Sequence, residues 1–85
     1  MDLGIRIDEQ QLLRQVSDGD EAAFRVLFDQ YRGKLFTYIL KLSDSREMAE
    51  DTVHDVFLKI WEGRETLNTV ENLNAYLFRI AHNQA

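Results

Sequence analysis

Residues 49–62, Ala-Glu-Asp-Thr-Val-His-Asp-Val-Phe-Leu-Lys-Ile-Trp-Glu, have two chemically different sides. At about 100° per residue, a helix here gathers its apolar residues on one side: Ala49, Val53, Val56, Phe57 and Ile60. The opposite side, called the acidic face below, carries Glu47, Asp51, His54, Asp55, Leu58 and Glu62. An apolar stripe of this kind is typical of a helix that packs on other helices. The stretch therefore predicts an amphipathic helix in an all-α fold.

The residues before this helix predict two further helices. Proline is absent and only four glycines occur, so few residues interrupt helices. Asp8 can cap a short helix that ends near Asp18-Gly19, and Asp20 can cap the next and longest one. Gly33, inside that long helix, predicts a slight bend or a close helix contact. The long helix has a sustained apolar stripe, formed by Phe24, Leu27, Phe28, Tyr31, Leu35, Tyr38, Ile39 and Leu42.

The remaining boundaries complete a bundle of about four helices without a sheet. Asp44 and Glu47 stand at capping-box spacing, so Asp44 is the expected cap of the third helix. Residues 64–72 have no helical stripe and predict a loop, and Asn72 can cap a last helix that is still in pattern at Ala85. We therefore expect a flexible N-terminus at residues 1–7 and one helical domain at residues 8–85, cut from a longer protein.

Composition limits the class of protein. The chain has 85 residues, 45% of them hydrophobic, which suits one small domain with its own core. It has no cysteine, which excludes disulfides and thiolate metal sites and suits a reducing compartment. No apolar run is long enough to span a membrane, and the N-terminus lacks a signal-peptide pattern. We expect a soluble cytoplasmic protein without membrane insertion.

The net charge of −5 is concentrated around the acidic face. Residues 44–62 hold six acidic and two basic residues, whereas residues 1–43 hold seven and six, and residues 63–85 are balanced. Binding to DNA phosphates requires clustered lysine and arginine, so composition alone argues against nonspecific DNA binding. The acidic face is either a solvated surface or a surface for a basic partner. Leu58 among the carboxylates favours the partner, which would also relieve their mutual repulsion.

Catalytic and metal-binding patterns are weak. Asp51 and His54 are one turn apart and, with Glu50, form the only conceivable metal cluster, but no second helix offers a matching pair. No nucleophile elbow or phosphate-binding glycine loop occurs. We therefore expect no metal, no cofactor and no enzyme. Two alternatives stay open: a helical protein-interaction adaptor that uses the acidic face without binding DNA, and a small metalloenzyme built on these three residues.

Three segments resemble the conserved second region of bacterial sigma factors. Residues 18–24, Asp-Gly-Asp-Glu-Ala-Ala-Phe, resemble the start of that region, and residues 49–61 resemble its polymerase-binding helix. Residues 72–83, Asn-Leu-Asn-Ala-Tyr-Leu-Phe-Arg-Ile-Ala-His-Asn, resemble its promoter-reading helix in the extracytoplasmic-function subgroup. The resemblance covers roughly residues 8–85, and the order and gaps of the three segments make it specific. It implies a transcription-initiation subunit that has no catalytic role of its own.

The resemblance implies a protein partner for the acidic face. In this family the matching helix docks on a basic coiled coil, the clamp helices of the largest RNA polymerase subunit. In the subgroup an anti-sigma protein commonly masks this region, so it is a further candidate partner. His54 stands where glutamine is common in the family. The implied polymerase-binding residues are Glu47, Asp51, His54, Asp55, Leu58 and Glu62.

The resemblance also implies a DNA site. In the subgroup, the loop matching residues 64–72 captures a base flipped out of the minus-ten promoter element, which requires hydrogen-bonding groups and stacking surfaces. Hydrogen-bonding groups are expected from Asn68, Thr69, Glu71 and Asn72, and stacking from Tyr76 or Phe78. Arg79 and Asn83 share the less apolar side of the last helix with Phe78. Family members continue with a basic helix end and a helix-turn-helix domain, so we expect weak DNA binding by this chain alone.

Overall fold

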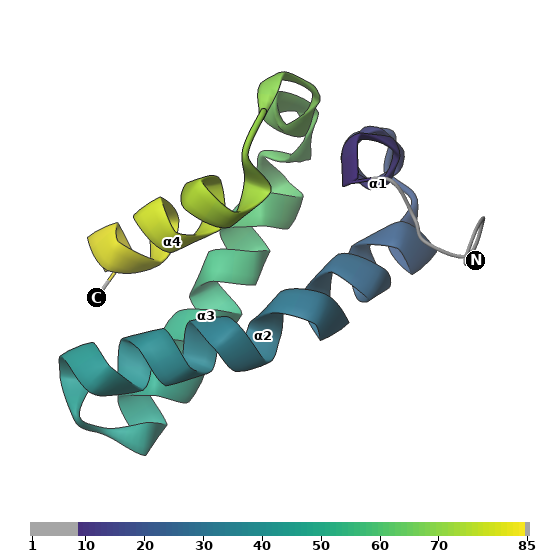
Figure 1. Cartoon of the computed structure of the whole chain (residues 1–85). Helices are drawn as coiled ribbons and strands as arrows, with labels where there is room; N and C mark the ends of the chain where they lie inside the picture. The colour runs from purple at the N-terminus through teal and green to yellow at the C-terminus, as the bar shows by residue number, and fades with distance from the viewer. Residues whose placement is uncertain (1–8, 85) are drawn as a thin grey trace, which may run out of the picture.

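The amphipathic helix expected from the sequence is present as α3 (Arg46–Glu62). The computed structural model describes residues 9–84. Each apolar residue of the predicted stripe, from Ala49 to Ile60, is buried, with at most 8% of its surface exposed. This burial comes from packing against α2 (Glu21–Ser43), which runs back along α3 from the tight turn at residues 44–45 (Figure 1). The local pattern and the tertiary packing of α3 therefore agree.

The described part of the chain is an all-α bundle with four α-helices and a single 3-10 helix, as the sequence predicted apart from the 3-10 helix. α1 packs on α2 and on η1, and α4 packs on α3 and α2. Figure 1 accordingly shows α1 near η1 and α4 on the other side of α3. No helix within residues 9–84 is long and apolar enough to cross a membrane. The elements outside the α2–α3 pair are α1 (Glu9–Ser17), η1 (Arg64–Thr69) and α4 (Leu73–Gln84).

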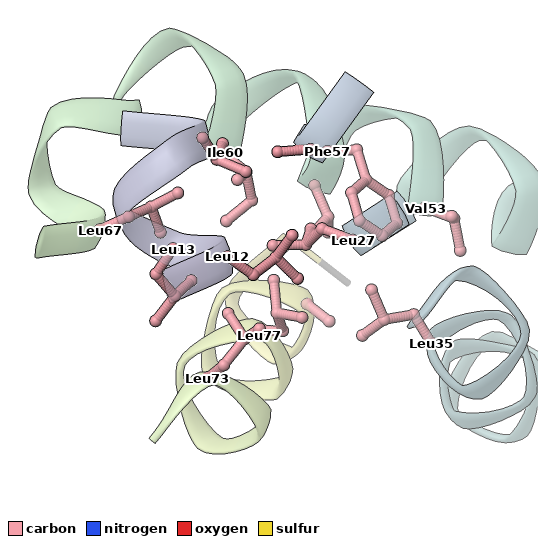
Figure 2. Packing of buried hydrophobic residues seen from close by; sticks show 14 of the residues in the cluster. Leu12, Leu13, Leu27, Leu35, Val53, Phe57, Ile60, Leu67, Leu73 and Leu77 are labelled. Atoms are coloured by element: carbon pink, nitrogen blue, oxygen red, sulfur yellow. The ribbon is translucent and has the colours of Figure 1, made fainter. Parts of the chain in front are cut away.

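A single hydrophobic core joins all five elements (Figure 2). Beyond α3, its fully buried leucines include Leu13, Leu27, Leu67 and Leu77, one each from α1, α2, η1 and α4. Within the described residues, no buried side-chain nitrogen or oxygen lacks a hydrogen-bond partner. Of the stripe predicted for α2, Leu27, Leu35 and Ile39 are buried, its aromatic residues are half-buried, and Leu42 in the last turn is 49% exposed. Leu42 lies past the end of the core.

One of the predicted helix caps is wrong. Asp20 caps α2 as expected, and its carboxylate accepts a hydrogen bond from the Ala23 N–H at 3.1 Å. Asp44 does not cap α3, because its φ of 57° places it in the left-handed region, where it ends α2. An N-cap needs extended backbone, which Ser45 has, and the Ser45 hydroxyl accepts from the Met48 N–H at 3.3 Å. Asp8 and the predicted flexible residues 1–7 lie outside the described residues.

Gly33 does not mark a close helix contact. A Cβ added at this position would meet no other atom within 4 Å, and α2 continues through it from Glu21 to Ser43. A glycine in a helix costs about 1 kcal/mol relative to alanine, and packing of the buried stripe on either side, including Leu27 and Leu35, compensates for this cost.

Candidate functional site

The acidic face is exposed along the whole of α3. All six of its residues are exposed, and Leu58 presents 47% of its surface to solvent. Glu47, Asp51 and Asp55 follow each other at intervals of four residues, so they form a row along the helix. The one ion pair found within 4.0 Å among residues 9–84 joins Arg25 and Asp29 of α2. No cation of the described residues therefore lies within 4.0 Å of the carboxylates of this face.

An open hollow of about 670 Å³ lies beside the acidic face, between α2 and α3. Its lining includes Phe24 and Phe28 of α2, Trp61 of α3, and His54 and Leu58 of the acidic face itself. The Phe24 and Trp61 rings pack on each other with centroids 5.0 Å apart, and the rings of Phe24 and Phe28 both pack on Phe57. Sequence reasoning assigned Phe24 and Phe28 to the core, whereas the structure leaves both half-exposed. Leu58 is thus continuous with an aromatic surface, which the helical period alone did not reveal.

The segment expected to be a loop is only partly one. Residues 64–69 form η1, and Leu67 within it is 1% exposed and belongs to the core. Threonine hydroxyls satisfy the backbone of this short helix: Thr66 donates to the Gly63 carbonyl at 2.9 Å and Thr69 to the Thr66 carbonyl at 2.8 Å. Only Val70, Glu71 and Asn72 lie between η1 and α4. The prediction of an irregular loop across residues 64–72 is therefore wrong for its first six residues.

The four hydrogen-bonding candidates of this segment, Asn68, Thr69, Glu71 and Asn72, are all exposed. The Asn72 side-chain oxygen accepts from the Ala75 N–H at 3.0 Å, which confirms Asn72 as the cap of α4. That oxygen keeps a second lone pair, so Asn72 still offers one acceptor site together with its side-chain NH₂ donors. The segment brings amide, hydroxyl and carboxylate groups together at one end of the bundle.

The two aromatic candidates of α4 have different surroundings. The Tyr76 hydroxyl lies 3.3 Å from the Thr66 hydroxyl, so Tyr76 joins α4 to η1. Phe78 instead packs edge-on against Tyr38 of α2, with ring centroids 5.0 Å apart. The Tyr38 hydroxyl in turn lies 3.4 Å from Nδ1 of His82. Tyr76 is thus the aromatic residue tied to the polar segment, whereas Phe78 belongs to a contact between α2 and α4.

The remaining α4 candidates, Arg79 and Asn83, are exposed and one turn apart. The Arg79 guanidinium carbon lies 6.0 Å from the centre of the Tyr76 ring, so a cation stands beside the aromatic candidate. Within residues 9–84, no three His, Asp or Glu side chains come together in a way that could hold a metal ion.

Comparisons with known proteins identify the family. The model of the sigma-70 region 2 family matches residues 27–85. A sigma factor of Mycolicibacterium vanbaalenii, "ECF RNA polymerase sigma factor SigK", is 31% identical over 75 residues, covering 87% of this chain and 38% of the relative. "ECF RNA polymerase sigma factor SigL" of Mycobacterium tuberculosis is 32% identical over 65 residues, covering 75% of this chain and 37% of the relative.

The chain thus spans roughly two fifths of the length of these relatives. No solved structure matches it. The match to the family model covers more than half of the chain and includes α3, η1 and the polar segment before α4. The chain therefore belongs to the sigma-70 family of RNA polymerase sigma factors, and it is a region 2 domain of the ECF subgroup.

Proposed function

We propose that this chain is the part of an ECF sigma factor that binds the RNA polymerase core and recognises and melts the minus-ten promoter element. The acidic face of α3 binds the basic clamp helices of the largest polymerase subunit. The segment 68–72 captures a flipped base, and the polymerase performs all the chemistry in the cytoplasm. The observation that carries the proposal is the row of exposed carboxylates on α3, none of which has a cation within 4.0 Å among the described residues.

Electrostatics supports binding of the acidic face to a basic surface. Carboxylates on one face repel each other, and a basic coiled coil offsets this repulsion because its positive charges attract the carboxylates. Long-range attraction also accelerates encounter with such a partner. Leu58 adds apolar area in the middle of the charges, which is the composition of an interface with an apolar centre and a charged rim.

Chemical groups support base capture by the polar segment. A flipped base offers its Watson–Crick edge to hydrogen-bonding groups and its ring to an aromatic side chain. Asn68, Thr69 and Glu71 are exposed and near the start of α4. Tyr76, tied to η1 through Thr66, is the aromatic group in position to stack on the base. Phe78 is already engaged with Tyr38.

Charge reversal tests the polymerase contact. We expect Asp51→Lys with Asp55→Lys to abolish binding to polymerase core, measured by titration of fluorescently labelled chain, while circular dichroism shows unchanged helicity. Asp18→Lys with Glu65→Lys changes the net charge equally at exposed positions away from α3 and should bind core normally. Full core binding by the first variant would instead favour a helical adaptor that uses another surface.

Segment exchange tests the DNA contact. Replacing residues 65–72 with those of another ECF family member, within a full-length sigma factor, should change promoter preference and leave core affinity unchanged. An exchange that leaves promoter preference as it was would remove the DNA role from this segment.

A further inference from the structure

α1 supports the segment to which we assign promoter recognition. It packs against η1, and Leu12, Leu13 and Leu67 are buried in the same core (Figure 2). η1 contributes no other residue to the buried set, so Leu67 is the apolar anchor directly before residues 68–72. Neither the family resemblance nor the proposed polymerase contact of the acidic face gives a role to α1.

Side chains also fix both ends of the stretch from Arg64 to Leu73, which contains residues 68–72. At its start, the Arg64 guanidinium donates to the Trp61 carbonyl at 2.8 Å, and its carbon lies 4.4 Å from the centre of the Trp61 ring. At its end, the Leu73 N–H donates to a carboxylate oxygen of Glu9 at 3.3 Å. Glu9 is the first residue of α1 and is 64 positions away in sequence.

The Glu9 contact lies at the start of α4. The first N–H groups of a helix have no partner within the helix. Asn72 provides a partner for Ala75, and Glu9 provides one for Leu73. A negative charge is also favourable at this position because of the helix dipole. The Glu9 carboxylate also interacts with Tyr31 of α2. The pKa of the Tyr31 phenol is raised, first by burial and second by the negative charge of Glu9.

We propose that Glu9 is a positioning residue for promoter recognition: through the Leu73 N–H it holds the start of α4, and with it the exposed groups of residues 68–72, in one arrangement. This inference rests on the proposed function of the segment. Glu9 does not contact DNA in this account. It reduces the number of conformations that the segment must give up when a base enters, so its effect appears in DNA affinity and base selectivity.

Three α1 variants separate this role from general stability. Glu9→Ala removes the acceptor, and Glu9→Gln keeps an acceptor oxygen without the charge. Gln11→Ala alters an exposed α1 residue whose side chain makes no hydrogen bond within the described residues. Hydrogen exchange of the 85-residue chain then reports the contact directly. We expect the Leu73 amide to exchange faster in Glu9→Ala only, while the Ala75 amide keeps its protection from Asn72.

DNA selection reports the functional consequence. Each variant, bound to polymerase core, is titrated with single-stranded DNA that carries a randomised central stretch, and the bound sequences are determined. We expect Glu9→Ala to lose about threefold to tenfold in affinity for the selected DNA, the range expected for one lost hydrogen bond. It should also bind a broader set of bases, with core affinity unchanged. Glu9→Gln should recover most of both properties.

Equal losses of core and DNA binding in Glu9→Ala would show a merely structural role and overturn the inference. Unchanged base selectivity despite faster Leu73 exchange would overturn it as well. Failure of the proposed function of the segment is distinguishable, because in that case the complex of the unmodified chain with polymerase core itself selects no bases. The Leu73 exchange measurement does not depend on polymerase.

Discussion

Leu58, Leu42 and Met48 are the large apolar side chains that residues 9–84 expose most. Leu58 differs from the other two in its surroundings, because it lines the aromatic hollow between α2 and α3 and lies within the acidic face. An apolar side chain that a partner covers contributes to binding without contributing to folding. At the scale of single residues, a substitution of Leu58 is therefore the best way to change the proposed polymerase contact without changing the stability of the fold.

Leu58→Ala should weaken core binding about tenfold and leave the free energy of unfolding nearly unchanged. The reason is that full burial of a leucine side chain stabilises by about 1.5–3 kcal/mol, and the exposed half of Leu58 becomes buried only in the complex. Titration of core polymerase and urea unfolding measure the two effects. Leu42→Ala is a matched control, since Leu42 is 49% exposed and Leu58 47%. An equal loss in both variants would contradict the prediction.

The turn between α2 and α3 gives a second test at residue scale. Asp44→Gly should be more stable than Asp44→Asn by about 0.5–1 kcal/mol, because glycine has no Cβ to strain the left-handed backbone. Ser45→Ala should lose about 1 kcal/mol with the N-cap hydrogen bond. Urea unfolding measures all three variants. If Asp44 were the N-cap, asparagine would be more stable there than glycine, and the order would reverse.

At the scale of elements, α3 and η1 show what the sequence predicted and what it did not. The stripe of α3 repeats over several turns, so period alone identified all five of its buried residues. η1 has one buried residue, Leu67, and one residue shows no period. Threonine hydroxyls add hydrogen bonds to its backbone, and the sequence equally allows such bonds in a loop. The contact between Glu9 and Leu73 was unpredictable for another reason: it joins residues far apart in the chain.

Leu67→Ala tests whether η1 is part of the core. We expect a loss of about 2–5 kcal/mol in the free energy of unfolding, as for other leucines in closed cores, because the cavity is enclosed between η1 and α1. Glu65→Ala, at an exposed position of the same element, should change stability by less than about 0.5 kcal/mol. Thermal and urea unfolding measure both. Similar small changes in the two variants would mean that η1 behaves as the loop predicted from the sequence.

At the scale of the whole molecule, the acidic surface and the proposed DNA segment lie on different elements. The net charge of −5 comes almost entirely from residues 44–62, which include all of α3, whereas the polar segment 68–72 follows the C-terminal end of α3. The sequence alone located this charge, because charges can be summed over each part of a chain. The structure adds that the carboxylates of the acidic face are exposed. The segment proposed to bind DNA, residues 68–72, carries one acidic residue, Glu71, and no basic one. Affinity for phosphates must therefore come from elsewhere in the complex.

The chain alone should consequently bind duplex DNA weakly at physiological salt. Binding to phosphates releases counterions only where lysine and arginine cluster, and the net charge of this chain repels DNA. Fluorescence anisotropy with a duplex and with single-stranded DNA, at two salt concentrations, measures the affinity, and the addition of polymerase core should raise the affinity for the single strand. Tight duplex binding by the chain alone, with little dependence on salt, would contradict the prediction. It would mean that DNA contacts a surface other than residues 68–72, and the assignment of base capture to that segment would fall with it.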